Sequence, residues 1–585
     1  MPPLFLHLLT ALSLWAALAA TPHAEDAPAA PVPAESADAL DAGAYLAGRE
    51  AEIQGDFPQA MHWLAEARRA DPENIDLLSR SILADIVMGN LSDAAELATT
   101  VKSVAVEKPS LIDFALLADA ARREDYAALA QELKNGRSIG RLFDGLALGW
   151  AEAGEGRMSE ALKQFDAVIK EPGLKEQGLF HKAMALAMVG DYEGADDILS
   201  GKAAGPVGVN SRGVIAHAEI LSQLERGDEA LALLDRAFGD SQNADLEILR
   251  AQLGTGKPAP FDAIRNPRDG IAEIFYTLAT SIGIEADPTL ALLHSRAALA
   301  LRPDHIEALM ISAALFEQMK QYGLAAEIYA SVPADNPAYL SAEVGRAQAL
   351  YADGQKDDAI SALNDLAENH PGDMQIQAAL ADLLRGEERW KEALAAYDEA
   401  IALIEKDDDS RNWSLYFSRG ITLERLGRYS DSVAAMRKAL ELQPDEPQVL
   451  NYLGYSMLEE GDSLDEAIGL IKRAVKAEPN SGYILDSLAW AYFRLGDYKE
   501  ALAPMERAAM LEPVEPVVTD HLGDVYWMNG RKREARFQWR RALSFGPEEK
   551  DAQRIREKLA KGLDAVMQEE GDDPLPATKS AGNAD

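Results

Sequence analysis

A recurring proline sets the strongest constraint on how this chain can fold. Equivalent positions in the second half are spaced by 34, 34, 34, 39, 35, 34 and 34 residues, and they hold Pro303, Pro337, Pro371, Glu405, Pro444, Pro479, Pro513 and Pro547. The same pattern precedes these positions. A Gly-Asp-Tyr-like turn is followed by two alanines, as in LGDYKEALAPMERAAMLEP. A fixed period of this length is typical of stacked supersecondary units and not of a closed globule.

Each repeat predicts two helices. In residues 483–513 the first helix is expected from Tyr483 to about Leu495, because Gly496 favours helix termination. The second is expected from Tyr498 to Leu511, and Pro513 cannot continue it. Alanines recur where antiparallel helix axes would approach closely. We therefore predict an all-α fold, an α-solenoid in which antiparallel helix pairs stack into a superhelix.

The ends of the chain differ from the repeats. Residues 4–20, LFLHLLTALSLWAALAA, predict a signal peptide over 1–24, although no Lys or Arg precedes them; a retained N-terminal anchor is the alternative. Residues 25–40 form a Pro/Ala linker that we expect to be disordered. At the other end, 548–567 predict an amphipathic capping helix, and 568–585 a disordered acidic tail.

Between these ends we expect two arrays, a degenerate one over 41–250 and a regular one over 271–547. The stretch GTGKPAPFDAIRNPRDG holds three prolines and three glycines, which break helices. It predicts a joint at 251–270. The alternative is one irregular repeat inside a continuous coil.

Composition excludes several classes of function. The 57 basic and 97 acidic residues give a net charge of −40, which excludes nucleic acid as the main partner and disfavours adsorption to anionic lipid. The chain has no cysteine, so disulfides, zinc-thiolate sites and an acylated lipoprotein N-terminus are excluded. The nine histidines are scattered, and no phosphate-binding loop, HExxH or G-x-S-x-G motif occurs. We therefore expect no catalysis, no metal and no cofactor.

The repeat pattern resembles the tetratricopeptide repeat family. The resemblance is carried by Leu488, Ala489, Tyr492, Gly496, Tyr498, Ala501, Ala508 and Pro513, and again by Leu522, Gly523, Tyr526, Gly530, Ala535, Ala542 and Pro547. Residues 451–475 and 521–543 also resemble secreted or envelope-associated proteobacterial members of that family. The resemblance implies the helical stack and, more loosely, a role as a scaffold.

Ten residues are predicted to line a partner-binding groove. On the helix over 483–495, Tyr483, Asp486, Trp490 and Phe493 run one residue out of phase with the core stripe, so we expect them to face the concave side. The full set is Phe417, Asn451, Tyr455, Tyr483, Asp486, Trp490, Phe493, Asp520, Asp524 and Trp527. Exposed aromatics in a concave surface suit capture of an extended or helical segment. Packing between repeats and occupation by the chain's own tail are the alternatives.

A second candidate surface is basic. Arg531, Lys532, Arg533, Arg536, Arg540 and Arg541 form the main basic cluster of an acidic chain. This patch would dock an acidic partner or an anionic envelope polymer. The alternative is a solvated convex face, paired with the acidic residues at 569–573.

Together these features predict a non-catalytic scaffold or adaptor in the periplasm, or a secreted one. It would bind a protein partner in its groove and, by resemblance, serve the assembly of an envelope complex. After signal cleavage no stable membrane span remains. Two alternatives are a structural protein that self-associates into a homo-oligomer, and an accessory factor for polysaccharide export or secretion.

Overall fold

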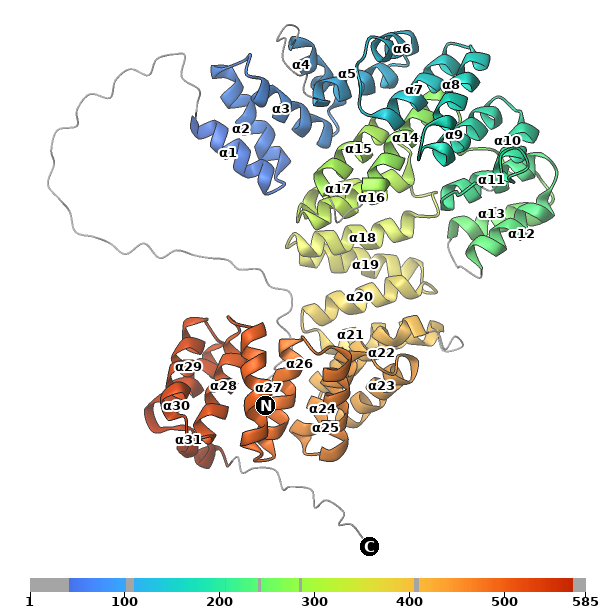
Figure 1. Ribbon diagram of the computed structural model, residues 1–585. Coiled ribbons are helices and arrows are strands. Elements are labelled where there is room, and N and C mark those ends of the chain that lie inside the picture. The colour runs from blue at the N-terminus through green and yellow to red at the C-terminus, as the bar shows by residue number, and fades with distance from the viewer. Residues whose placement is uncertain are drawn as a thin grey trace, which may run out of the picture.

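A computed structural model describes residues 42–101, 110–205, 207–239, 244–282, 287–404 and 410–571. The predicted signal peptide and linker, and residues 572–585 of the predicted tail, lie outside the described residues. In the part described, the chain forms 31 α-helices and one short 3-10 helix, and no strand. The predicted all-α solenoid is confirmed (Figure 1). Within the same ranges no helix is both long and apolar enough to cross a membrane.

The first thirteen helices form an arc of paired elements (Figure 1). They are α1 (Ala42–Ile53), α2 (Phe57–Ala70), α3 (Ile75–Val87), α4 (Leu91–Thr100), α5 (Ser110–Arg122), α6 (Tyr126–Lys134), α7 (Arg141–Gly154), α8 (Met158–Lys170), α9 (Lys175–Met188), α10 (Tyr192–Leu199), α11 (Ser211–Gln223), α12 (Gly227–Phe238) and α13 (Ala244–Gly254).

Eight more helix pairs follow. They are α14 (Pro267–Ile282) with α15 (Pro288–Leu301), α16 (Ile306–Gln318) with α17 (Tyr322–Tyr329), α18 (Tyr339–Ala352) with α19 (Lys356–Asn369), α20 (Met374–Gly386) with α21 (Trp390–Ile404), α22 (Trp413–Arg425) with α23 (Tyr429–Leu442), α24 (Pro447–Glu460) with α25 (Leu464–Ala477), α26 (Gly482–Arg494) with α27 (Tyr498–Leu511), and α28 (Pro516–Met528) with α29 (Lys532–Ser544).

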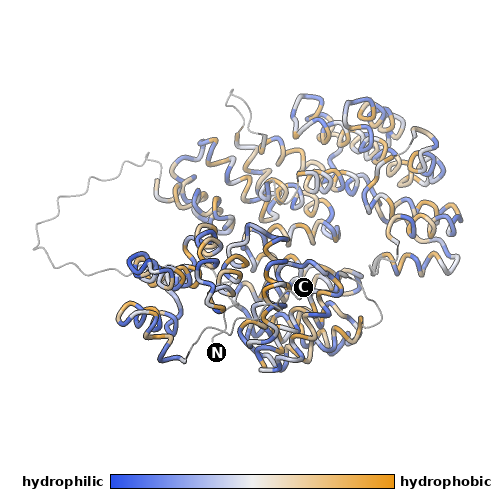
Figure 2. The backbone as a smooth tube through the Cα atoms, turned by 60° about the horizontal axis from the view of Figure 1, so that its bottom comes forward, coloured by the Kyte–Doolittle hydropathy of each residue, from blue (hydrophilic) through white to orange (hydrophobic). Residues whose placement is uncertain are grey.

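Local sequence explains why each pair turns where it does. Gly496 ends α26 with a φ of 80°, a left-handed conformation that glycine adopts without steric cost. Ala489, Ala501 and Ala508 are fully buried between α26 and its neighbours, where larger side chains would hold the axes apart. Apolar and polar residues alternate along the helices, so each helix presents an apolar face to the stack (Figure 2).

The two helices of a pair have different places in the stack. Consecutive first helices, such as α24 and α26 or α26 and α28, contact each other directly. Among the described elements, consecutive second helices from α19 to α29 contact each other less than consecutive first helices do. The first helices therefore line the inner side of the curve and the second helices its outer side.

Both predicted arrays contribute to the largest hydrophobic cluster, which ends at Ala349. The helix α14 packs against α7, α9 and α5, while α15 packs against α3 and α5, so this pair lies inside the arc of the first thirteen helices (Figure 1). Side chains from Phe57 to Ala349 belong to a single buried cluster. The linker between α13 and α14 is held in place, because Gln223 and Ser222 bond the backbone of Ala259. The segment 251–270 is thus held against α11 as it crosses from α13 to α14.

The C-terminal cap consists of two helices where one was predicted. They are α30 (Glu549–Lys561) and α31 (Leu563–Glu570), and the chain breaks between them at Gly562, whose φ is 91°. A Cβ atom at this position would lie 2.7 Å from the ring of Trp527. Close packing on α28 therefore requires glycine here, and the glycine ends the helix.

Candidate functional site

The aromatic residues of the predicted groove are largely consumed by packing between repeats. Phe493 is only 4% exposed and Trp527 only 7%. The half-buried ring of Trp490 stacks on Phe493 at 4.8 Å and on His521 of the next first helix at 4.0 Å. The expectation that this stripe stays out of the packing is therefore wrong for these residues. The reason is that neighbouring first helices contact each other, so their inner edges pack together.

The polar residues at equivalent positions are also buried. Both carboxylate oxygens of Asp486 lie near Nδ1 of His521, at 3.0 and 3.1 Å. Burial disfavours the charged imidazole, but the charge and hydrogen bond of Asp486 outweigh it and raise the pKa of His521. Asn451 is buried as well, 5% exposed. The Asp486–His521 pair joins adjacent repeats, and all three side chains are too buried to offer much to a partner.

The C-terminal cap covers and pairs the last two acidic residues of the predicted groove, Asp520 and Asp524. Lys558 of α30 is fully buried, and its Nζ donates to Asp520 at 2.7 Å and to both oxygens of Asp524 at 2.8 and 2.7 Å. Nε1 of Trp539 donates to Asp524 at 2.8 Å. Burial raises the pKa of Asp520 although Lys558 opposes it. The stripe thus ends in a closed ionic cluster beneath α30.

Five residues of the predicted groove keep partial access. They are the half-buried Phe417, Tyr455, Tyr483, Trp490 and Asp520. Phe417 also meets the ring of Tyr452 edge-on at 5.7 Å. Of the two alternatives to a groove, packing between repeats describes most of the ten predicted residues, and the half-buried ones are spread over α22, α24, α26 and α28.

An inner surface that sequence reasoning missed lies on α18, α20 and α22. At the repeat positions equivalent to Tyr483 and Trp490, these helices carry exposed polar residues, namely Ser341, Gln348, Gln375, Asp382 and Ser414. Val344, Ala378 and Phe417 lie between them, half-buried. The 34-residue spacing locates these positions, but amides and hydroxyls carry no hydropathy signal that marks them as part of a binding surface. We name this set the middle inner face.

The inner side of the N-terminal arc is occupied by α14. There Glu273 is 1% exposed, and its Oε2 lies 3.1 Å from Nη2 of Arg212 and 3.5 Å from Nε2 of His305. Burial opposes ionisation, but Arg212 and His305 outweigh it and lower the pKa of Glu273 to about 2. Arg212 also reaches Glu307 at 2.5 Å. This buried network fixes α11, α14 and α16 together.

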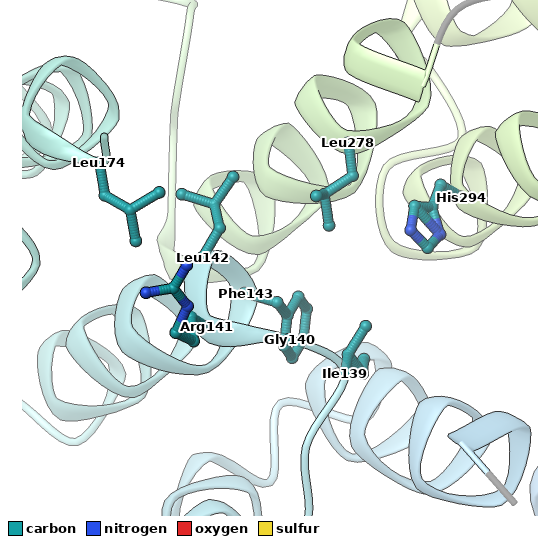
Figure 3. A pocket seen from close by; sticks show the side chains of 8 residues that line it. All are labelled: Ile139, Gly140, Arg141, Leu142, Phe143, Leu174, Leu278 and His294. Carbon is teal, nitrogen blue, oxygen red and sulfur yellow. The ribbon is translucent and has the colours of Figure 1, made fainter. Parts of the chain in front are cut away.

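A cavity of about 270 Å³ lies where the start of α7 meets α14 and α15 (Figure 3). It is lined by Ile139, Gly140, Arg141, Leu142, Phe143, Leu174, Leu278 and His294. Burial lowers the pKa of His294 to about 4, so its imidazole is neutral at pH 7. Ligand pockets usually measure roughly 300–1,000 Å³. This mostly apolar cavity is therefore suited to one side chain or a small apolar group.

Most of the predicted basic patch makes internal contacts. Arg531 pairs with Glu506 at 2.8 Å, and Lys532 lies 4.4 Å above the ring of Trp527. Arg536 donates to the carbonyl of Leu559, and Arg541 to that of Pro513. Arg533 and Arg540 are exposed, and neither forms an ion pair within the described ranges. The basic patch does not pair with the acidic residues that the structure describes in 569–573. Glu569 pairs instead with Lys561 of α30, and Glu570 with Arg554 of the same helix.

The paired helices, their 34-residue spacing and the buried alanines at the turns match one known family. The tetratricopeptide repeat family matches residues 344–410, 417–481 and 458–516. These segments of the chain are tetratricopeptide repeats. Tetratricopeptide repeats form a stack that suits protein–protein interaction.

Several known proteins are similar to parts of this chain. TPR repeat-containing protein PA4667 of Pseudomonas aeruginosa is 27% identical over 394 residues, which are 66% of this chain and 65% of that relative. Human protein O-mannosyl-transferase TMTC1 is 27% identical over 176 residues, 30% of this chain and 20% of the transferase. Among solved structures, the APC/C hetero-tetramer Cut9–Hcn1 is similar with a TM-score of 0.37 and 14% identity, covering 89% of this chain and 96% of that one. The chain thus spans less than two thirds of the length of PA4667 and of TMTC1.

Proposed function

We propose that this tetratricopeptide repeat protein is a non-catalytic scaffold of the bacterial envelope that binds an extended or helical segment of a protein partner. The binding surface would be the middle inner face of α18, α20 and α22. The observation that carries this proposal is the contrast along the inner side. In α26 and α28 the side chains at these positions are half-buried or buried, whereas α18, α20 and α22 together expose five polar ones, and α24 exposes only Gln448.

The chemistry of this face suits a polypeptide. The amides of Gln348 and Gln375 can each donate and accept a hydrogen bond, as an extended main chain requires. The half-buried Val344, Ala378 and Phe417 between them provide apolar contact area. The face carries both a carboxylate, Asp382, and a guanidinium, Arg385, which bond each other at 3.4 Å. A partner segment with uncharged polar and small apolar side chains therefore suits it better than a highly charged one.

An envelope location is the second part of the proposal. It is supported by the apolar run at residues 4–20 and by the absence of cysteine in the chain. A fusion of alkaline phosphatase after residue 40 tests it, because that enzyme folds only outside the cytoplasm. Activity of the fusion, lost when residues 4–20 are deleted, is the expected result. An inactive fusion would place the scaffold inside the cell.

Position-specific photocrosslinking in intact cells tests the binding surface. A photoreactive amino acid is placed at Gln348, Gln375 or Asp382, and in a control at Glu399, an exposed residue of the second helix α21. We expect the same partner to be crosslinked from the three inner positions and not from the control. Crosslinks to another copy of this chain would show self-association instead. Equal crosslinking from Glu399 would contradict the proposed face.

A further inference from the structure

Three arginines place the last outer helices side by side. Arg473 of α25, Arg507 of α27 and Arg541 of α29 are 34 residues apart. Each one reaches back to the loop that follows the preceding second helix. Arg473 donates to the carbonyl of Pro444 at 2.6 Å, Arg507 to Oδ1 of Asn480 at 2.6 Å, and Arg541 to the carbonyl of Pro513 at 2.5 Å. The helices α25, α27 and α29 therefore form one continuous outer surface.

The solvent side of α29 combines cations with an exposed aromatic ring. The buried residues Ala535, Trp539 and Ala542 define its core side. Arg533, Phe537 and Arg540 lie on the opposite side, because they follow one another at intervals of four and three residues. Phe537 is 62% exposed. An aromatic side chain with this exposure, between two exposed arginines, is not explained by packing within the chain.

The solvent side of α27 continues the same chemistry. Its core side is defined by Ala501, Met505 and Ala508. Met510 projects from the other side and is 80% exposed, and Val514 in the loop that follows is 69% exposed. Because Arg541 of α29 bonds the carbonyl of Pro513, this apolar pair adjoins the end of α29.

This surface is basic although the chain is acidic. The whole chain has a net charge of −40. On α25, α27 and α29 the basic residues nevertheless outnumber the acidic ones: Lys472, Arg473, Lys476, Lys499, Arg507, Lys532, Arg533, Arg536, Arg540 and Arg541 against Asp465, Glu466, Glu500, Glu506 and Glu534. Three of these acids are neutralised locally, since Glu466 pairs with Arg437, and both Glu506 and Glu534 pair with Arg531. Two of the bases are paired as well, Arg473 with Asp445 and Lys532 with Asp564, which leaves Arg533 and Arg540 as the cations of α29 whose side chains form neither an ion pair nor a hydrogen bond among the described residues.

We propose that this outer basic face, defined by Lys499, Met510, Val514, Arg533, Phe537 and Arg540, docks on an anionic lipid surface. Peptide capture uses a groove or a sheet edge, and this face lies on the outer side of the curve. Apolar side chains that project between cations can insert at the boundary of headgroups and acyl chains while the cations meet the phosphates. Charges elsewhere on the chain are screened beyond about 8 Å at physiological ionic strength, so the overall acidity does not prevent docking.

Co-sedimentation with lipid vesicles tests this proposal. The chain is used without residues 1–24, whose removal leaves every described residue in place and eliminates the apolar run. Vesicles consist of phosphatidylcholine alone or of phosphatidylcholine mixed with phosphatidylglycerol. We expect sedimentation only with the mixed vesicles. Arg533→Glu combined with Arg540→Glu should lower the partition coefficient at least about thirtyfold, because each basic residue lost near an anionic surface weakens binding about fivefold. Phe537→Ser should weaken it about tenfold.

Two control variants separate this face from general charge and hydrophobicity. Lys163→Glu with Lys170→Glu makes the same charge change at the same spacing on the outer helix α8. Val189→Ser removes an apolar side chain that is 56% exposed near the end of α9. Both should bind vesicles as the parent chain does. The proposal is overturned if the parent chain fails to sediment with the mixed vesicles, or if the controls lose binding equally. Loss of vesicle binding alongside retained binding of a poly-glutamate peptide would identify an acidic polypeptide as the occupant instead.

Discussion

Replacing Lys558 with methionine should detach the C-terminal cap. The ammonium of Lys558 is fully buried and donates to three carboxylate oxygens, one of Asp520 and two of Asp524, at 2.7 to 2.8 Å. Methionine preserves much of the side-chain volume but leaves Asp520 without its bonded cation, and Asp524 with only Arg554 at 3.7 Å, in a buried site. Removing one partner of a buried ion pair costs about 3–5 kcal/mol. The cost falls on the docking of α30 and α31, because they are the elements that Lys558 ties to α28.

Hydrogen–deuterium exchange of residues 549–570 measures this cost directly. Terminal units of a repeat stack open locally, so the loss appears as faster exchange there and not across the chain. A loss of 3 kcal/mol corresponds to an increase in exchange rate of about a hundredfold or more. Lys561→Met is the matched control in the same helix, since Lys561 pairs with Glu557 and Glu569 at the surface, and it should change exchange little.

A rescue variant makes the reasoning refutable. Combining Lys558→Met with Asp520→Asn and Asp524→Asn removes the uncompensated charges while the amide at 524 can still accept from Trp539. This triple variant should recover most of the lost protection. If Lys558→Met leaves exchange of 549–570 unchanged, or if the triple variant is no better than the single one, the buried ion cluster does not hold the cap.

Three further predictions concern other contacts. Because Asp486 raises the pKa of His521, the contact between α26 and α28 is fully stabilised below about pH 6.5 and should weaken as the pH rises past the raised pKa. Urea unfolding followed by tryptophan fluorescence should show this loss of stability, and Asp486→Asn should abolish the pH dependence. Gly270→Ala should lower the free energy of unfolding by about 1–3 kcal/mol, because the new Cβ would lie 2.3 Å from the ring of Trp150. Gly469→Ala, with open space around the new Cβ, should raise the free energy of unfolding by about 0.5–1 kcal/mol, and thermal denaturation measures both changes. Arg296→Met removes hydrogen bonds to the carbonyls of Val87 and Met88 at 2.8 and 3.0 Å, so hydrogen exchange should rise in α1 to α4, and unchanged exchange there would show that α15 does not anchor them.

The sequence predicted the local structure well because the determinants of a helix pair are local. Gly496, Ala501 and Pro513 specify one turn, one close approach and one stop, and the helices begin and end close to them. The return of α14 into the N-terminal arc was not predictable in this way. It depends on contacts between residues far apart in the chain, such as Arg212 with Glu273, which leave no periodic signal.

The candidate site was predicted less well, for a related reason. The stripe with Trp490 and Phe493 lies where neighbouring first helices meet, and its exposure depends on how closely those helices approach. That distance follows from the superhelical geometry, which single-helix periodicity does not contain. The sequence pattern pointed to aromatic residues as the anchors for a partner. The inner positions that stay exposed in the structure carry small or polar residues such as Gln348 and Ser414.

The closed core between Phe57 and Ala349 has an evolutionary consequence. Where α14 and α15 fill the inside of the arc, the number of helix pairs is fixed by geometry, because one pair more or fewer would change the circumference around an unchanged centre. After residue 350 the stack is open, and duplicating or losing a 34-residue unit would alter only its length. Homologous chains should therefore differ in repeat number in the C-terminal part and keep it constant before that point.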